Sequence, residues 1–207
     1  MGRTKTIDDD HILRRAREVF REGGHTASTR NVARAAGISQ AVLYQRFGSK
    51  ENLFLRAMTP DAPDLKALLG PYPPRSARAD LKRIGERVAE YLVSLVPTIL
   101  HVLAHPYIGR HRLAKWHEGL PFHALVAALT DRFTRLREDG FVGRVDPAAA
   151  ARAFLTAIHS AALVEAMSHH GAPEDRRAHV DSLVEVLWAG LAPPPAGGSK
   201  RAHTDAD

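Results

Sequence analysis

Hydrophobic residues recur three and four positions apart along most of the chain, which is the spacing of one face of an α-helix. The first such segment contains Ile12, Ala16 and Phe20. No convincing alternation of apolar and polar residues, the pattern of a half-buried β-strand, interrupts the series. The sequence therefore predicts an all-α protein of about nine helices.

Three short helices are predicted between residues 28 and 58. A serine precedes each of them, where its side-chain oxygen can accept a hydrogen bond from the first turn: Ser28, Ser39 and Ser49. The first two helices make up residues 28–47 and are joined by a short turn that contains Gly37. This is the helix-turn-helix pattern, whose second helix enters the major groove of DNA. The alternative is a structural three-helix motif that touches no DNA.

Proline and glycine divide the rest of the chain. Residues 59–75 contain five prolines, and proline lacks the amide donor that a helix interior needs, so we expect a connector there. Longer helices follow, one of them over residues 110–138 with residues 119–121 as a point for a kink. The sequence predicts an N-terminal three-helix helix-turn-helix DNA-binding domain (1–59), a C-terminal helical bundle for ligand binding and dimerisation (60–192) and a disordered tail (193–207).

The positive charge of the chain is concentrated near its N-terminus. Lys and Arg number 29 against 23 Asp and Glu, a net charge of +6. Residues 1–58 alone hold 11 basic and 6 acidic side chains. Such an asymmetry suggests a polyanionic partner, although a basic surface can also serve solubility alone. There is no cysteine, which excludes disulfides, thiolate metal sites and thiol nucleophiles.

Residues 9–58 resemble the DNA-binding domain of the TetR (tetracycline repressor) family of transcription regulators. The stretch from Gly37 to Leu53 follows the family's pattern almost position for position. The recurring features stand here as Ser39, Leu43-Tyr44, Phe47 and the run Ser49-Lys50-Glu51. The resemblance implies an all-helical DNA-binding protein that dimerises through its last two long helices. It does not extend to the ligand chemistry of the C-terminal part.

The outward positions of the second helix of the motif are candidates for base contacts. Glutamine can pair with an adenine edge, and alanine or valine can touch a thymine methyl group. The predicted base contacts are Gln40, Ala41, Val42, Tyr44 and Gln45. Hydroxyl and cationic side chains can donate to phosphates, and the resemblance assigns Tyr44 and Lys50 to this role. The predicted phosphate contacts are Thr29, Arg30, Tyr44, Arg46 and Lys50.

The C-terminal bundle carries aromatic and aliphatic residues at helical spacing, which are either plain core or the lining of a ligand cavity. Histidines add polar lining. The candidate pocket residues are Tyr91, Leu95, His101, His105, Trp116, Phe122, His123, Val126, Phe154 and His159. His101 and His105 have the four-residue spacing of a metal pair, but no carboxylate or thiol cluster nearby completes a ligand set. We therefore expect no metal and no cofactor.

The predicted helix at residues 147–168 is apolar on almost all sides, although polar residues interrupt it too often for a membrane span. Such a helix must be covered on both sides, and a second copy of the chain is the simplest cover. With the last helix it would form a four-helix bundle across a two-fold axis. The alternative is a monomer that folds both helices inward. The predicted interface residues are Phe154, Ile158, Ala161, Val180, Leu183, Val184, Leu187 and Trp188.

Together these features predict a ligand-responsive, sequence-specific transcription regulator that binds DNA as a homodimer. The expected mechanism is repression at a palindromic operator, released by a small-molecule effector that favours the arrangement with lower DNA affinity. The alternatives are a DNA-binding protein without an effector and a helical enzyme. No nucleotide loop, catalytic triad or carboxylate pair supports an enzyme. The polar N-terminus and the lack of an apolar run of roughly 18 residues predict a cytoplasmic protein without a membrane partner.

Overall fold

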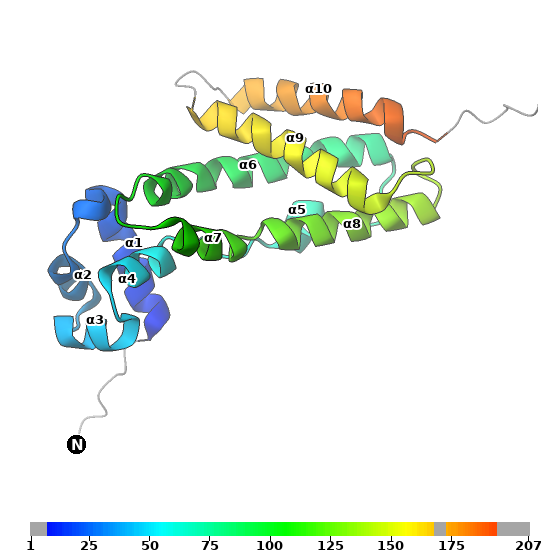
Figure 1. Cartoon of the computed structure of the whole chain (residues 1–207). Coiled ribbons are helices and arrows are strands. Elements are labelled where there is room, and N and C mark those ends of the chain that lie inside the picture. The colour runs from blue at the N-terminus through cyan, green and yellow to red at the C-terminus, as the bar shows by residue number, and fades with distance from the viewer. Residues whose placement is uncertain (1–7, 168–172, 194–207) are drawn as a thin grey trace, which may run out of the picture. The chain divides into compact units, whose positions relative to one another are not determined.

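A computed structural model describes residues 8–167 and 173–193 of the chain. Within these residues the structure has ten α-helices, one 3-10 helix and no strand (Figure 1), which confirms the predicted fold class. The elements in chain order are α1 (Asp9–Gly23), η1 (Gly24–Thr26), α2 (Thr29–Ala36), α3 (Gln40–Phe47), α4 (Lys50–Ala57), α5 (Leu65–Leu69), α6 (Ala77–Leu103), α7 (Arg110–Glu118), α8 (Phe122–Glu138), α9 (Pro147–Met167) and α10 (Pro173–Leu191).

Contacts between residues divide the chain into two compact units. Unit 1 consists of residues 1–63 and 94–121, and unit 2 consists of residues 64–93 and 122–207. Residues 94–121, which the sequence assigns to the C-terminal bundle, therefore group with the helix-turn-helix. The long helix α6 begins in unit 2 and ends in unit 1.

The core of unit 1 is built from α1 to α4, the end of α6, and α7. Phe20 of α1 and Phe54 of α4 are fully buried and meet edge to face, with their ring centroids 5.1 Å apart. Val102 of α6 and Trp116 of α7 belong to the same buried cluster. Because apolar burial is the main stabilising term in folding, the helix-turn-helix depends on side chains that lie far along the chain.

Local sequence signals set the ends of the helices in the motif. The hydroxyl oxygens of Ser28, Ser39 and Ser49 accept hydrogen bonds from backbone N–H groups three residues further on, at 3.1 to 3.2 Å. Gly37 ends α2 in the left-handed conformation, with φ at 68°, which glycine adopts without steric cost. This stop allows α3 to begin at Gln40. The predicted caps are therefore confirmed.

Unit 2 is a helical bundle in which α9 packs along α8 and α10 (Figure 1). Phe133 of α8 and Phe154 of α9 are buried, with ring centroids 6.1 Å apart. The first part of α6 approaches α9 and α10 closely at Gly85. A Cβ atom at Gly85 would lie 2.7 Å from Val180 Cγ1 and 3.3 Å from Ile158 Cδ1. The missing side chain therefore permits this close approach.

Proline has different effects at two places in the chain. The segment 110–138, predicted as one helix with a kink, is two helices, α7 and α8, separated at residues 119–121. Pro121 has no N–H to donate and disfavours a helical preceding residue, so the first helix ends before it. Helix α6, in contrast, continues through Pro97 and forgoes one backbone hydrogen bond there.

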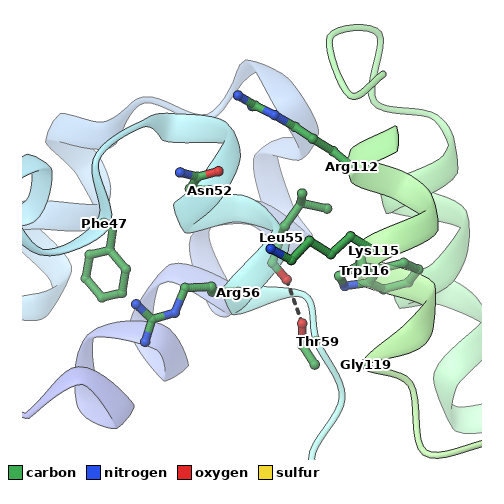
Figure 2. Close-up of a pocket in the computed structure, with 9 residues that line it drawn as sticks. All are labelled: Phe47, Asn52, Leu55, Arg56, Thr59, Arg112, Lys115, Trp116 and Gly119. Atoms are coloured by element: carbon green, nitrogen blue, oxygen red, sulfur yellow. Dashed lines mark hydrogen bonds between the residues drawn. The ribbon is translucent and has the colours of Figure 1, made fainter. Parts of the chain in front are cut away.

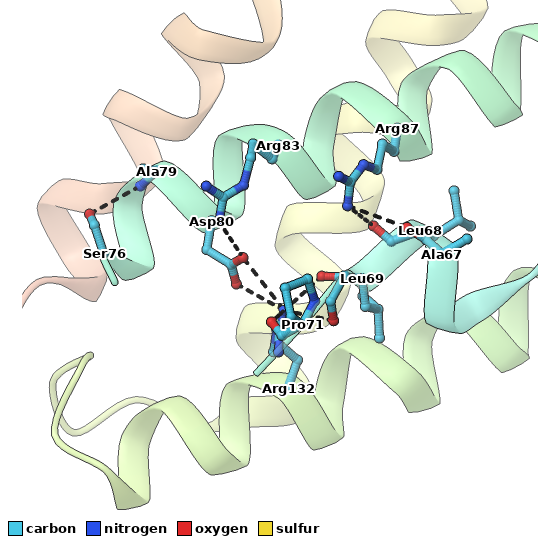
Figure 3. Close-up of polar contacts among 11 residues, drawn as sticks. Ala67, Leu68, Leu69, Pro71, Ser76, Ala79, Asp80, Arg83, Arg87 and Arg132 are labelled. Carbon is cyan, nitrogen blue, oxygen red and sulfur yellow. Dashed lines mark hydrogen bonds and ion pairs between the residues drawn. The ribbon is translucent and has the colours of Figure 1, made fainter. Parts of the chain in front are cut away.

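A buried ion pair joins α6 and α8 within unit 2 (Figure 3). Arg132 and Asp80 are 4% and 2% exposed, and Arg132 Nη2 lies 3.2 Å from Asp80 Oδ2. The same nitrogen donates to the carbonyl oxygens of Leu69 and Pro71, at 2.6 and 2.9 Å. Burial lowers the pKa of Arg132, and the charge of Asp80 opposes this shift. The pair thus holds the backbone after α5 against α8.

One helix in the described ranges, α9, is long and apolar enough to cross a membrane by length and composition, with a mean hydropathy of 1.3. The sequence itself predicts no span, because it contains no apolar run of roughly 18 residues. Helix α9 nevertheless reaches a high mean hydropathy, because polar residues are spread along it among many apolar ones. Core helices pass the same test, and Ile158 and Ala162 are buried within unit 2. Glu165 also accepts a hydrogen bond from Arg176 Nε of α10 at 2.8 Å.

Candidate nucleic-acid interface

Helix α3 has one buried face and one exposed face. Leu43 and Phe47 are buried in the core of unit 1 and hold the helix in place. Tyr44 is 43% exposed although its ring is large. Val42 is half-buried. The remaining predicted base contacts are exposed: Gln40, Ala41 and Gln45. The face that carries hydrogen-bonding groups is therefore open to solvent.

A hydroxyl group of α2 positions two of these side chains. Gln40 Nε2 donates to Thr29 Oγ1 at 2.8 Å, and the hydroxyl oxygens of Tyr44 and Thr29 lie 3.1 Å apart. Thr29 itself is only 7% exposed. Its predicted role as a phosphate contact competes with these two hydrogen bonds. Gln45 makes no hydrogen bond in the part of the chain that the structure describes.

The predicted phosphate-binding cations are arranged in different ways. Arg30 is exposed and has no ion pair with the described residues. Lys50 Nζ donates to the backbone oxygen of His25 at 2.7 Å. Arg46 Nη1 lies 3.3 Å from Asp9 Oδ1, so its charge is partly neutralised within unit 1. The phosphate role predicted for Arg46 competes with this ion pair, which sequence spacing alone does not show.

The ten candidate pocket residues are not gathered in one unit. Leu95, His101, His105 and Trp116 lie in unit 1, and the other six lie in unit 2: Tyr91, Phe122, His123, Val126, Phe154 and His159. Phe154 is part of the core of unit 2, and His123 and His159 are exposed. Among the described residues no group of three or more His, Asp or Glu could hold a metal ion.

His105 is a core residue of unit 1. Its ring lies 4.6 Å from that of Phe54, between centroids, and it is buried. Its Nδ1 accepts a hydrogen bond from the backbone N–H of Tyr107 at 3.3 Å. Burial, followed by the charge of His25, lowers the pKa of His105. The side chain thus serves packing and is not a ligand contact in the described pockets.

A pocket of about 480 Å³ lies within unit 1, and of the ten candidates Trp116 lines it (Figure 2). Helix α4, helix α7 and the last residue of α3 form its walls. Sequence reasoning missed its other members. A signal was present, because Arg112, Lys115 and Trp116 are three and four residues apart and so share one helix face. The lining residues are Phe47, Asn52, Leu55, Arg56, Thr59, Arg112, Lys115, Trp116 and Gly119.

Half of the predicted dimer-interface residues lie in the core of unit 2. Phe154, Ile158, Val180 and Val184 are at most 1% exposed within a single chain. They are unavailable to a second copy because they pack inside their own unit, as the surroundings of Gly85 show. The other four are half-buried: Ala161, Leu183, Leu187 and Trp188.

Exposed apolar side chains on the same two helices were missed. They point away from the core because they fall between the buried positions of each helix. Val186 is 76% exposed, and Val164 and Met167 are each 62% exposed. Leu163 adds to this surface. Exposed apolar groups of this kind are typical of a surface that another protein covers.

Comparison with known proteins agrees with this architecture. Residues 12–57 match the family model described as bacterial regulatory proteins, tetR family. No curated protein matches the sequence. The matched residues run from the core residue Ile12 of α1 to Ala57 at the end of α4, so they cover the helix-turn-helix with its supporting helices.

Solved structures share the fold over most of the chain. A protein described as a TetR-family transcriptional regulator from Mesorhizobium loti MAFF303099 matches with a TM-score of 0.72 and 21% identity, over 89% of this chain and 96% of that one. GusR of Salmonella enterica matches with a TM-score of 0.64 and 24% identity, over 88% and 94%. FadR of Bacillus subtilis, in complex with stearoyl-CoA, matches with a TM-score of 0.60 and 16% identity, over 88% and 99%. Residues 12–57 are therefore similar to the N-terminal domain of bacterial regulatory proteins of the tetR family, and the chain shares its fold with solved structures described as TetR-family regulators.

Proposed function

We propose that the protein is a sequence-specific transcription regulator, a homodimeric repressor that a small-molecule effector releases from a palindromic operator. The observation that carries this proposal is the open face of α3. Its amide and hydroxyl groups are exposed, whereas Leu43 and Phe47 anchor the helix from behind. A helix of a helix-turn-helix that is held in this way suits insertion into a major groove.

The proposed base readout uses two glutamines in different ways. Gln40 is held by Thr29, so its amide approaches DNA in a preset orientation. Gln45 has a free amide that can donate to and accept from an adenine edge. Ala41 and Val42 supply methyl groups for thymine. The proposed phosphate contacts are Arg30, Tyr44 and Lys50.

The proposed dimer places two copies of α3 on one side of DNA. The exposed apolar residues Val164, Met167 and Val186, together with the half-buried Leu183 and Trp188, would form the shared surface. A two-fold axis makes the two recognition helices read the same sequence on opposite strands. Half-sites about 34–36 Å apart, one turn of DNA or a multiple, are then expected.

The proposed release by an effector rests on the thermodynamic linkage between ligand binding and DNA binding. A ligand that binds one arrangement of the dimer better than the other lowers or raises DNA affinity by that difference, typically about 1–3 kcal/mol. FadR of Bacillus subtilis, which shares the fold, has been solved with stearoyl-CoA. The shared fold supports the effector part of the proposal.

The test is selection of double-stranded DNA from a random library by the purified full-length protein. We expect a palindromic sequence, and fluorescence anisotropy at increasing salt should give a steep loss of affinity because counterions are released. Arg30→Gln should reduce the salt slope by about one unit, since one phosphate contact is lost. Gln45→Ala should relax the preference at one base position of each half-site.

The matched control is Lys66→Gln, which removes an exposed positive charge from α5 in unit 2. It should leave both the affinity and the salt slope unchanged. Selection of no sequence, or an equal effect of Arg30→Gln and Lys66→Gln, would contradict the proposal. A selected site without two-fold symmetry would contradict the dimer.

A further inference from the structure

The pocket of unit 1 combines apolar walls with positive charge. Leu55 of α4, Trp116 of α7 and Phe47 of α3 supply apolar surface, and Arg112 and Lys115 extend from α7 (Figure 2). Its volume of about 480 Å³ is sufficient for a small organic molecule. No carboxylate side chain is among the residues that line it.

The positive charges of Arg112 and Lys115 on α7 are only weakly balanced by negative charges of the protein. Neither Arg112 nor Lys115 makes a hydrogen bond or ion pair with any residue that the structure describes. The pKa of Glu51 is lowered mainly by hydrogen bonds from its own backbone and from Ser49, and only to a smaller extent by Arg112. Arg56 differs, because it pairs with Asp9 at 3.3 Å. Two positive charges of α7 that line the pocket are therefore available to an anion.

A buried donor in the same pocket also lacks a partner. Trp116 is 7% exposed, and its indole Nε1 is buried without a hydrogen bond. Figure 2 shows the nitrogen edge of the ring turned toward α4, on the side of the pocket. Buried N–H groups are nearly always satisfied, so an unpaired one beside a cavity points to an acceptor supplied from outside the chain.

These three observations restrict the chemistry of the occupant. A purely inorganic anion would leave the walls at Leu55 and Trp116 in contact with water. A neutral apolar molecule would leave the charges of Arg112 and Lys115 unpaired. A molecule with a carboxylate at one end and an apolar body satisfies both parts, because ion pairs and apolar burial then act together.

We propose that this pocket is a binding site for a small organic carboxylate with an aromatic or aliphatic body. The carboxylate pairs with Arg112 and Lys115, the body packs between Leu55 and Trp116, and a ligand oxygen accepts from the indole N–H. The site uses no residue of unit 2, where six of the ten predicted pocket residues lie.

Several residues that line the pocket belong to the recognition helix α3 or to the helix that follows it in the chain. Phe47 is the last residue of α3, and Asn52, Leu55 and Arg56 belong to the helix that follows. An occupant therefore touches the elements that fix the position of α3. The regulatory consequence of this contact rests on the proposed function, whereas binding of the carboxylate does not.

The experiment measures binding to the full-length protein without DNA. Isothermal titration with 1-naphthoate should give a Kd below about 1 mM, and 1-naphthamide, which has the same shape without the charge, should bind at least about tenfold more weakly. Arg112→Gln and Lys115→Gln should each weaken 1-naphthoate by about three- to tenfold. Arg110→Gln, an exposed cation of α7 outside the pocket, is the matched control and should have no effect.

A second readout locates the ligand. In a Trp188→Phe background the tryptophan fluorescence of the protein comes from Trp116. Decanoate, an aliphatic carboxylate that neither absorbs nor emits in this range, should change this fluorescence in a saturable way. No binding of either 1-naphthoate or decanoate, equal binding of naphthoate and naphthamide, or an unchanged Trp116 signal would each overturn the proposal. Because DNA is absent, these failures leave the DNA-binding proposal intact, and a failed DNA selection leaves this site intact.

Discussion

A single histidine shows how the interior of unit 1 limits ionisation. His105 lies against Phe54 and has a buried Nε2 without a hydrogen-bond partner. The titratable groups near it are His25, Lys50 and Glu51, of which only Glu51 raises its pKa. Desolvation is the largest effect, so the neutral form is favoured in the folded protein.

The lowered pKa predicts a pH dependence of stability. In the unfolded chain the group has its ordinary pKa of about 6.5, so below that pH the unfolded state takes up a proton that the folded state does not. The contribution of neutral His105 to the free energy of unfolding is therefore at its full value above pH 6.5. It decreases as the pH falls below 6.5. The loss levels off once the pH passes the folded pKa.

Urea unfolding of the wild type and of His105→Gln, from about pH 8 to pH 5, checks this. The variant cannot titrate at this position, so its free energy of unfolding should fall less steeply than that of the wild type. Parallel curves would show that His105 does not contribute to the acid sensitivity. The other histidines are common to both proteins and cancel in the comparison.

At the level of elements, α2 and α3 are joined by more than apolar packing. Thr29 at the start of α2 bonds to Gln40 and Tyr44, one turn apart on α3. This arrangement uses a hydroxyl group to orient the exposed face of the recognition helix. A residue that touches no base can therefore affect the readout of bases.

Replacing Thr29 by valine keeps the shape of the side chain and removes the hydroxyl. We expect Thr29→Val to weaken binding to the selected DNA site by about three- to tenfold, because a typical hydrogen bond contributes about 0.5–1.5 kcal/mol. Thr29→Ser keeps the hydroxyl and should bind nearly as well as the wild type. Affinity is measured by fluorescence anisotropy, and circular dichroism monitors the fold. Equal affinities of the two variants would contradict this role.

Local features of the sequence predict the helices of the motif better than its polar contacts. The serine caps and Gly37 act on residues within one turn, so spacing reveals them. The pairing of Arg46 with Asp9 joins residues 37 positions apart, and Arg132 reaches Leu69 across 63 positions. Periodicity carries no information on which distant residues meet. The same limit explains why the pocket beside α7 was missed.

At the scale of the whole molecule, the buried ion pair of Arg132 and Asp80 contributes to the stability of unit 2. It connects α6, α8 and the backbone after α5, all within one unit. Asp80 has a second partner, Arg83, at 3.0 Å, but the side chain of Arg83 is half exposed. The two arginines therefore contact the same carboxylate in very different environments.

We expect Arg132→Met to lower the free energy of unfolding by about 3–5 kcal/mol, because it leaves the buried carboxylate of Asp80 without its buried partner and with only the half-exposed Arg83. Arg83→Met, the matched control, should cost less than about 1 kcal/mol, as is usual for exposed pairs. Adding Asp80→Leu to Arg132→Met should recover part of the loss. Thermal or urea unfolding measures all three, and similar losses for the two single variants would contradict the assignment.

The composition of unit 1 has a practical consequence for anyone who wishes to exchange or isolate the DNA-reading part. The residues that match the family model end at residue 57, yet Val102 and Trp116 fill the same interior. A piece cut after α4 keeps every residue proposed to touch DNA but leaves vacancies where these two side chains belong. A chimera that transplants the motif alone must therefore also supply a host whose side chains fit those two vacancies.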